Sequence, residues 1–112
     1  MKKLYKYQTN FLLLYSTFGQ EVKYKGDMVQ PLLNQFNEEQ AGARVSELER
    51  RGFLRYAHKE EVENSKLKYD GRKSYFTIGE KGWKFLKTVG IKDENDPTID
   101  ALLAKELLRR EE

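Results

Sequence analysis

The segment from Asn37 to Tyr56 most constrains the fold, because it predicts a helix with both ends marked and a strand directly after it. Asn37 can cap the first turn, and Gln40 stands three residues later, where a capping-box partner belongs. Gly52 suits the left-handed residue that ends a helix, since glycine has no Cβ to clash there. The apolar residues between these ends share one narrow face: Ala41, Val45 and Leu48.

The other side of this predicted helix is expected to face outward, because none of its residues is large and apolar. A short helix with a thin apolar stripe and a polar outer face has a shape that fits the major groove of DNA. The outward residues are polar, charged or small: Gln40, Ala43, Arg44, Glu47, Arg50 and Arg51.

These residue types match the hydrogen-bonding edges of the bases. Arg44 is the best candidate for guanine, since the arginine fork can bond O6 and N7 together. Gln40 can read adenine, Glu47 can accept from cytosine, and Ala43 allows close approach to a thymine methyl. The other arginines near the helix end are expected to hold phosphates: Arg50, Arg51 and Arg55.

Two runs of sequence resemble parts of the winged helix-turn-helix superfamily. ARVSELERRGFL resembles its recognition helix, in the small form found in phages, other mobile elements and prokaryotic regulators. YFTIGEKGWKFL resembles the last wing strand and the following helix, although Gly79 stands where a capping threonine is usual. The resemblance covers about residues 8–90 and implies an α+β fold with a three-helix core, a β-wing and additional C-terminal helices. It also implies a small transcriptional regulator that binds double-stranded DNA sequence-specifically, with helix 38–51 in the major groove.

The remaining elements are predicted from apolar spacing and from turn residues. Pro31 leaves two alternatives for the second helix: a short one from Pro31 to about Phe36, or a kinked one from about Asp27. Trp83 is expected to pack against the first helix or the sheet, and His58 to be a strand or surface residue. The other predicted elements are a helix over 8–18, an edge strand over 21–25, a turn at 26–27, strands over 54–58 and 74–78, and a helix over 80–88.

The segment over 59–73 is predicted to form a long wing that contacts the DNA backbone or the minor groove. Asp70 followed by Gly71 is a strong signal for a two-residue hairpin turn, so strands should lie on both sides of it. Three glutamates in the first half of the segment would repel phosphate, which leaves only the distal half for contact. The basic residues that flank the tip are Lys66, Lys68, Arg72 and Lys73.

Residues 1–90 are expected to form the winged domain, and residues 91–112 a linker followed by an amphipathic helix. Asp96 and Pro97 suit the N-cap and the first position of that helix. Two alternatives remain open for its apolar face: it forms a homodimer with a second copy, or it folds back on the first helix of its own chain. The apolar residues on this face are Ile99, Leu102, Leu103 and Leu107.

Positive charge is concentrated in two parts of the chain, although the net charge is only +3. Residues 1–25 carry five lysines and one glutamate, and residues 44–87 carry twelve lysines and arginines against seven acidic residues. Such a distribution is typical of a protein that binds a polyanion. A protein–protein interaction module on the same scaffold is the alternative, because fold does not determine function.

The sequence offers little for catalysis or for a bound cofactor. It has no cysteine and one histidine, and it contains no phosphate-binding glycine loop. We therefore expect no enzyme activity, no metal site and no cofactor. Polar residues interrupt the N-terminal apolar run, so it does not resemble a signal peptide in detail. No stretch approaches the ~20 apolar residues that cross a membrane, and a cytoplasmic protein with no membrane partner is expected.

Overall fold

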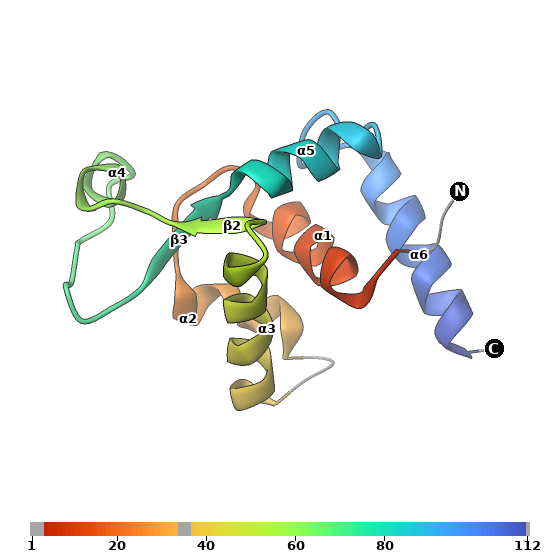
Figure 1. The fold of residues 1–112 in the computed structure, drawn as a ribbon, viewed down its shortest axis with the longest axis horizontal. Helices are drawn as coiled ribbons and strands as arrows, with labels where there is room; N and C mark the ends of the chain where they lie inside the picture. Colours follow the sequence, from red (N-terminus) through yellow and green to blue (C-terminus); the bar gives the residue numbers. More distant parts are fainter. Residues whose placement is uncertain (1–3, 34–36, 112) are drawn as a thin grey trace.

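The computed structural model describes residues 4–33 and 37–111, which form an α+β fold (Figure 1). A small antiparallel sheet of three strands, in the order β1-β3-β2, is surrounded by helices, an arrangement compatible with a winged-helix-like fold. The elements are α1 (Lys6–Phe18), β1 (Lys23–Tyr24), α2 (Lys25–Met28), the 3-10 turn η1 (Gln30–Leu32), α3 (Glu38–Arg50), β2 (Leu54–Tyr56), α4 (Lys59–Asn64), β3 (Tyr75–Ile78), α5 (Glu80–Thr88) and α6 (Pro97–Glu111).

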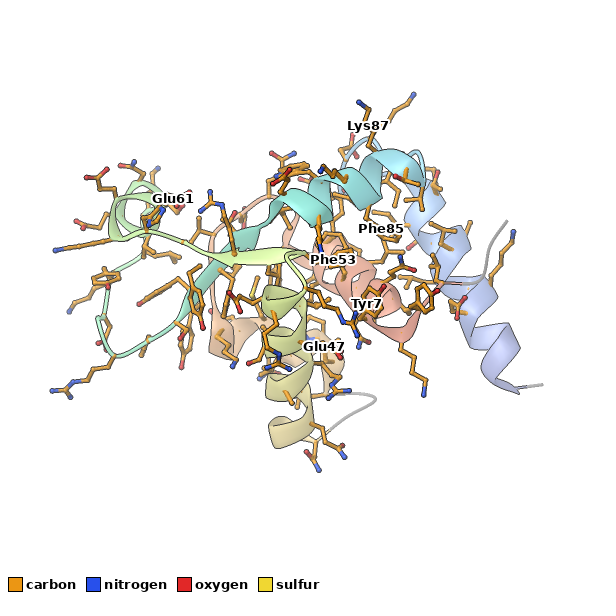
Figure 2. All side chains as sticks on the ribbon, in the orientation of Figure 1. Tyr7, Glu47, Phe53, Glu61, Phe85 and Lys87 are labelled. Carbon is orange, nitrogen blue, oxygen red and sulfur yellow. The ribbon has the colours of Figure 1, made fainter. Side chains whose placement is uncertain are left out.

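Helix α1 lies at the centre of the core, as its wide apolar face predicts. The helix begins at Lys6, two residues before the predicted start. The Phe11 side chain is fully buried and its ring lies 5.3 Å from that of Phe53 and 6.0 Å from that of Phe85, measured between centroids. Figure 2 shows Phe53 and Phe85 converging on α1 from the start of β2 and from α5.

The prediction for α3 is confirmed at both ends and along its buried face. Asn37 Oδ1 accepts the Gln40 backbone N–H at 2.8 Å, and Gln40 Oε1 accepts the Asn37 N–H at 3.3 Å. Gly52 adopts the expected left-handed backbone with φ +85°. The three residues of the predicted apolar face have no exposed surface: Ala41, Val45 and Leu48.

The second helix is closer to the kinked alternative, because its first turn begins at Lys25 and its helical geometry changes at Gln30. The chain forms the four-residue helix α2 and then the 3-10 turn η1, so Pro31 lies inside a short turn. The predicted turn at 26–27 lies within α2. Proline supplies no N–H, so an α-helical ladder cannot continue through Pro31. The bonds change to the tighter type, in which the Leu32 N–H donates to the Val29 carbonyl at 3.0 Å. The rest of the alternative that reached Phe36 lies outside the described residues.

The predicted strands are confirmed with shorter ends. β2 pairs with β3 in antiparallel register, so that Leu54 lies opposite Ile78 and Tyr56 lies opposite Phe76. The predicted edge strand over 21–25 contains the two residues of β1, which pair with the other side of β3. Leu54, Phe76 and Ile78 are buried in the core.

The long β-hairpin predicted over 59–73 is wrong, because the first part of this segment is helix α4. His58 is the N-cap of α4, and its backbone N–H donates to Glu61 Oε1 at 3.0 Å. Val62, the apolar residue within α4, is fully buried. The turn at Asp70 does exist, since the Lys73 N–H donates to the Asp70 carbonyl at 3.0 Å, but it connects no pair of strands. Val62 is buried when this segment is a helix, whereas a strand would turn every second side chain of the segment toward the same face.

The prediction that Trp83 packs in the core is also wrong, since 43% of this side chain is exposed. The reason lies at its neighbour Gly82. A Cβ at Gly82 would lie 2.5 Å from the Phe53 carbonyl oxygen, so α5 packs through its bare backbone at this point. Phe85 and Leu86 continue that buried face, and Trp83 therefore lies on the outer part of the helix.

Helix α6 packs on α1 of its own chain, which is the second of the two alternatives (Figure 1). Its start is as predicted: Pro97 is the first helical residue, and Asp96 Oδ1 accepts the Thr98 N–H at 2.9 Å. Ile99 and Leu102 are buried in the same core as α1. A homodimer through α6 stays a prediction, and it would have to use residues other than these two.

Replacing Ile99 with alanine tests this packing. The variant removes buried methyl groups from the core, so we expect the free energy of unfolding to fall by about 2–4 kcal/mol. Urea unfolding followed by circular dichroism measures the change. A loss that varies with protein concentration would contradict intramolecular packing of α6 and would indicate a dimer instead.

Candidate nucleic-acid interface

Helix α3 projects from the body of the molecule (Figure 1). Its inner face packs against α1 and α2. The predicted outward placement is confirmed: Gln40, Ala43 and Arg50 are exposed, and Arg44 and Glu47 are partly exposed. The five residues occupy two neighbouring stripes of α3: Ala43 and Arg50 lie on one, and Gln40, Arg44 and Glu47 lie on the other.

Gln40 and Glu47 are partly engaged within the chain. The Gln40 side-chain oxygen accepts the Asn37 N–H, so only its amide NH₂ remains for a partner. The Glu47 carboxylate lies 3.7 Å from the Arg51 guanidinium, measured from Oε2 to Nη2. Arg51 also stacks on the Tyr7 ring of α1, with 3.9 Å between the guanidinium carbon and the ring centroid. Arg51 therefore lies on the side of α3 that faces α1.

Arg44 has no hydrogen bond or ion pair with any residue that the structure describes. Its Nε atom is buried without a partner. No carboxylate among the described residues pairs with the guanidinium, so its positive charge is available to an external acceptor. The same holds for Arg50, which is exposed and forms no ion pair within residues 4–33 and 37–111.

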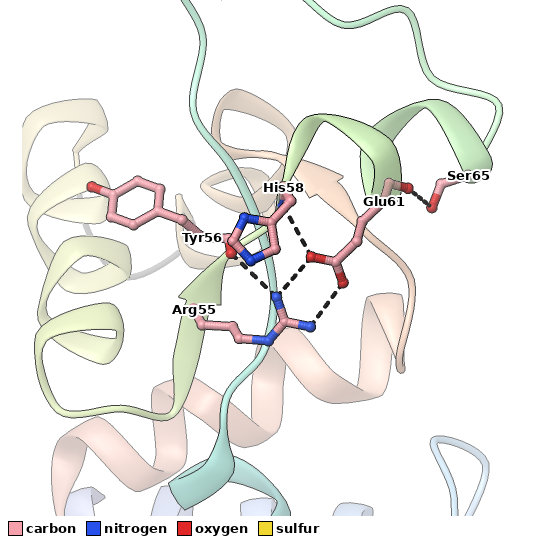
Figure 3. A network of polar contacts seen from close by, with 5 residues as sticks. All are labelled: Arg55, Tyr56, His58, Glu61 and Ser65. Atoms are coloured by element: carbon pink, nitrogen blue, oxygen red, sulfur yellow. Dashed lines mark hydrogen bonds and ion pairs between the residues drawn. The ribbon is translucent and has the colours of Figure 1, made fainter.

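Lys25 also lies against α3, although it is not among the contact residues predicted from the sequence. Its Nζ donates to Ser46 Oγ of α3 at 2.6 Å, which places its ammonium group beside the recognition-type helix. The sequence signal that could have indicated Lys25 is its place among the lysine-rich first 25 residues. The predicted edge strand over 21–25 ends at Lys25 and implies no contact with α3. Tyr56, with 56% of its side chain exposed, points toward α3 from the end of β2 (Figure 3).

The structure places Arg55 away from this surface. Its side chain leaves β2 in the direction opposite to α3 and binds Glu61 of α4 (Figure 3). Both arms of the guanidinium donate to the carboxylate, each at 2.8 Å. This guanidinium, together with the backbone N–H of His58, lowers the pKa of Glu61 from 4.5 to about 2. Arg55 therefore anchors α4, and the phosphate contact predicted for it stays a prediction.

The four basic residues predicted at the wing tip are divided among three places. Lys73 lies at the base, with its Nζ 4.8 Å from the centroid of the Tyr24 ring. Arg72 is exposed in the turn that follows Asp70. Lys66 and Lys68 line an open hollow beside α4.

Lys66 adopts an unusual backbone conformation in the part of the chain that the structure describes, where it is the only positive-φ residue other than glycine, at +63°. Its N–H donates to the Glu63 carbonyl at 3.1 Å, and the Leu67 N–H donates to the Val62 carbonyl at 3.3 Å. This pattern usually ends a helix at a glycine. A residue with a Cβ is less stable than glycine in this conformation by about 1 kcal/mol.

Comparisons of this chain with protein-family models, with curated proteins and with solved structures find no match. Among the described residues, no cluster of three or more histidine, cysteine, aspartate or glutamate side chains could hold a metal ion. None of the helices in residues 4–33 and 37–111 is long and apolar enough to cross a membrane.

Replacing Glu61 with glutamine tests the ion pair with Arg55. Because the folded-state pKa of Glu61 is about 2 and its usual value is 4.5, the pair stabilises the fold fully above pH 4.5. This stabilisation is lost as the pH falls toward 2. We expect Glu61→Gln to lower the free energy of unfolding at pH 7 by less than about 1 kcal/mol, since both side chains are partly exposed to solvent. Thermal unfolding from pH 2 to 7 should show the difference disappearing in acid; a constant difference would contradict it.

Gly42 offers a second test, because it lies inside α3 and a Cβ there would meet no atom within 4 Å. Glycine inside a helix is less stable than alanine by about 0.5–1 kcal/mol. We therefore expect Gly42→Ala to raise the free energy of unfolding by that amount in a urea titration. Destabilisation would show that an intramolecular contact needs the glycine. A stabilised variant that binds its partner less well would locate a close approach of the partner at Gly42.

Proposed function

We propose that this chain is a winged helix-turn-helix protein that binds double-stranded DNA sequence-specifically and acts as a small transcriptional regulator. In this proposal α3 enters the major groove. The projection of α3 from the body and the strand order β1-β3-β2 support it. Both features are typical of the winged-helix arrangement that the sequence resembles.

The single observation that carries the proposal is a set of three cations that belong to α3 or are held against it. Arg44 and Arg50 come from α3 itself, and Lys25 is held against it by Ser46. None of the three forms an ion pair with a described residue. Cations left without internal partners are suited to phosphate oxygens and base edges, because such contacts release counterions from DNA.

Arg44 is the residue that we propose as the principal base reader. Its guanidinium is unpaired, whereas Glu47 is close to Arg51 and Gln40 has given its oxygen to the helix cap. Arg50 and Lys25 are proposed to hold phosphates on the two sides of the groove. Ala43 is exposed between them and permits the helix to approach the base edges closely.

A protein–protein interaction module is the second candidate, and one observation favours it. Trp83 is a large aromatic residue with 43% of its side chain exposed on α5. Tryptophan is enriched at the centres of protein interfaces. This candidate predicts a partner on α5, whereas the DNA-binding candidate predicts one on α3, so substitutions on the two helices distinguish them.

Replacing Arg44 with alanine tests the proposed role in base reading. A preferred duplex is first selected from a random library, and its affinity is then measured by fluorescence anisotropy. We expect Arg44→Ala to weaken binding to that duplex by about 1–3 kcal/mol and to relax the preference at one base pair. Lys87→Ala is the matched control, because Lys87 is exposed on α5, far from α3 (Figure 2).

The dependence on salt completes this experiment. A DNA-binding protein should lose affinity linearly in log salt, because each phosphate contact releases counterions. Equal weakening of all sequences by Arg44→Ala would make Arg44 a phosphate contact and would overturn its role as a base reader. Absence of duplex binding at low salt would overturn the proposed function as a whole.

A further inference from the structure

An open hollow of about 580 Å³ lies beside α4, on the segment that was predicted to be a simple hairpin. Three lysines, Lys59, Lys66 and Lys68, line it together with the ring of Tyr69. Helix α4 forms one side and the chain that follows it forms the other. This site is separate from α3, so its chemistry can be argued on its own residues.

The hollow carries an excess of positive charge. Glu63 is the only acidic residue among those that line it. None of the three lysines forms an ion pair with a residue that the structure describes. Lys59 Nζ instead lies 5.7 Å from the centroid of the Tyr69 ring. Ammonium groups that surround one space without internal anionic partners are suited to a ligand with several negative oxygens.

The hollow is held in shape before any ligand arrives. Val62 of α4 is fully buried, and the ion pair between both arms of Arg55 and the Glu61 carboxylate connects α4 to β2 (Figure 3). The Lys66 backbone then turns through a left-handed conformation, which directs the chain around the hollow. A lysine stands at this position although a glycine would adopt the same backbone with less strain. Such pre-organisation lowers the entropy that binding would otherwise cost.

We propose that this hollow binds the phosphate groups of a nucleotide, with the base on the ring of Tyr69. Aromatic rings beside basic side chains are the usual surface for stacking a nucleotide base. Tyr69 is suited to this, because 38% of its side chain is exposed while its ring rests against that of Tyr75 with 5.8 Å between centroids. A free nucleotide and a nucleic-acid strand share this chemistry. The site goes beyond the proposed contact of α3 with the major groove.

The experiment measures two ligands with two matched double variants. Lys66→Gln with Lys68→Gln removes two charges from the hollow, and Lys87→Gln with Lys105→Gln removes two exposed charges elsewhere. Isothermal titration with ATP tests the free nucleotide, and fluorescence anisotropy with a single-stranded oligonucleotide at several salt concentrations tests the strand. We expect the hollow variant to lose affinity at least about tenfold for its ligand, and the control variant less than about twofold.

The two ligands identify the source of the phosphate. ATP binding that is lost only in the hollow variant supports a free nucleotide. No ATP binding, with an affinity for the single strand and a salt slope reduced only in the hollow variant, supports a strand. Equal behaviour of the two variants with both ligands overturns the site. ATP binding in the hollow without any duplex binding would support this site and overturn the proposed function, so the two failures are distinguishable.

Lys66→Gly is a second variant, which we expect to keep the fold. Glycine relieves the left-handed backbone at this position, so we expect an unchanged or higher melting temperature together with weaker ligand binding. Unchanged ligand binding in this variant would overturn the role of Lys66.

The ring is tested with Tyr69→Ala and two polyanions. The variant should weaken ATP more than it weakens inorganic tripolyphosphate, which has no base to stack. An equal effect on both would overturn the place of the base on Tyr69.

Discussion

The aromatic contact of Phe11 with Phe53 and Phe85 is the constraint on which the rest of the structure depends. It brings together α1, the start of β2 and α5, which are far apart in the sequence, with the last two rings 5.8 Å apart. Gly82 permits it, because any Cβ there would collide with the Phe53 carbonyl. Phe53 follows directly after the turn that ends α3. Its burial therefore sets the point at which α3 leaves the body and the side of α3 that faces outward.

The wing region depends on a second constraint, which acts through α4. The carboxylate of Glu61 has two tasks: it accepts the His58 N–H at the start of α4 and it binds both arms of Arg55 from β2. A single side chain thus couples the start of the helix to the edge of the sheet. For this reason the segment between β2 and β3 is a short helix with a basic hollow beside it. A simple hairpin in its place would present only a row of exposed side chains.

The sequence predicted the elements whose signals are local and missed those that depend on distant contacts. Asn37, Gln40 and Gly52 mark the ends of α3 within its own segment, so both ends were correct. The helix α4 was missed because the burial of Val62 is a tertiary effect, while the signal at Asp70 and Gly71 was local and real but connects no strands. Among the interface residues, the outward face of α3 was predictable, but the contact of Lys25 with Ser46 required the fold.

The distinction between local signals and distant contacts also applies to the charged side chains. The contacts in the folded chain determine which arginines can bind a partner. The distribution of charge along the sequence does not distinguish Arg44, Arg50, Arg51 and Arg55, since all lie in the basic segment after residue 43. In the folded chain Arg51 is stacked on a tyrosine ring beside a glutamate, and Arg55 is bound by a carboxylate. A cation that is already paired must give up that pair before it can hold a phosphate, so its net gain on binding is small. Arg44 and Arg50 form no ion pair with a described residue. The surface available to a polyanion is therefore narrower, and closer to the axis of α3, than the distribution of charge along the sequence implies.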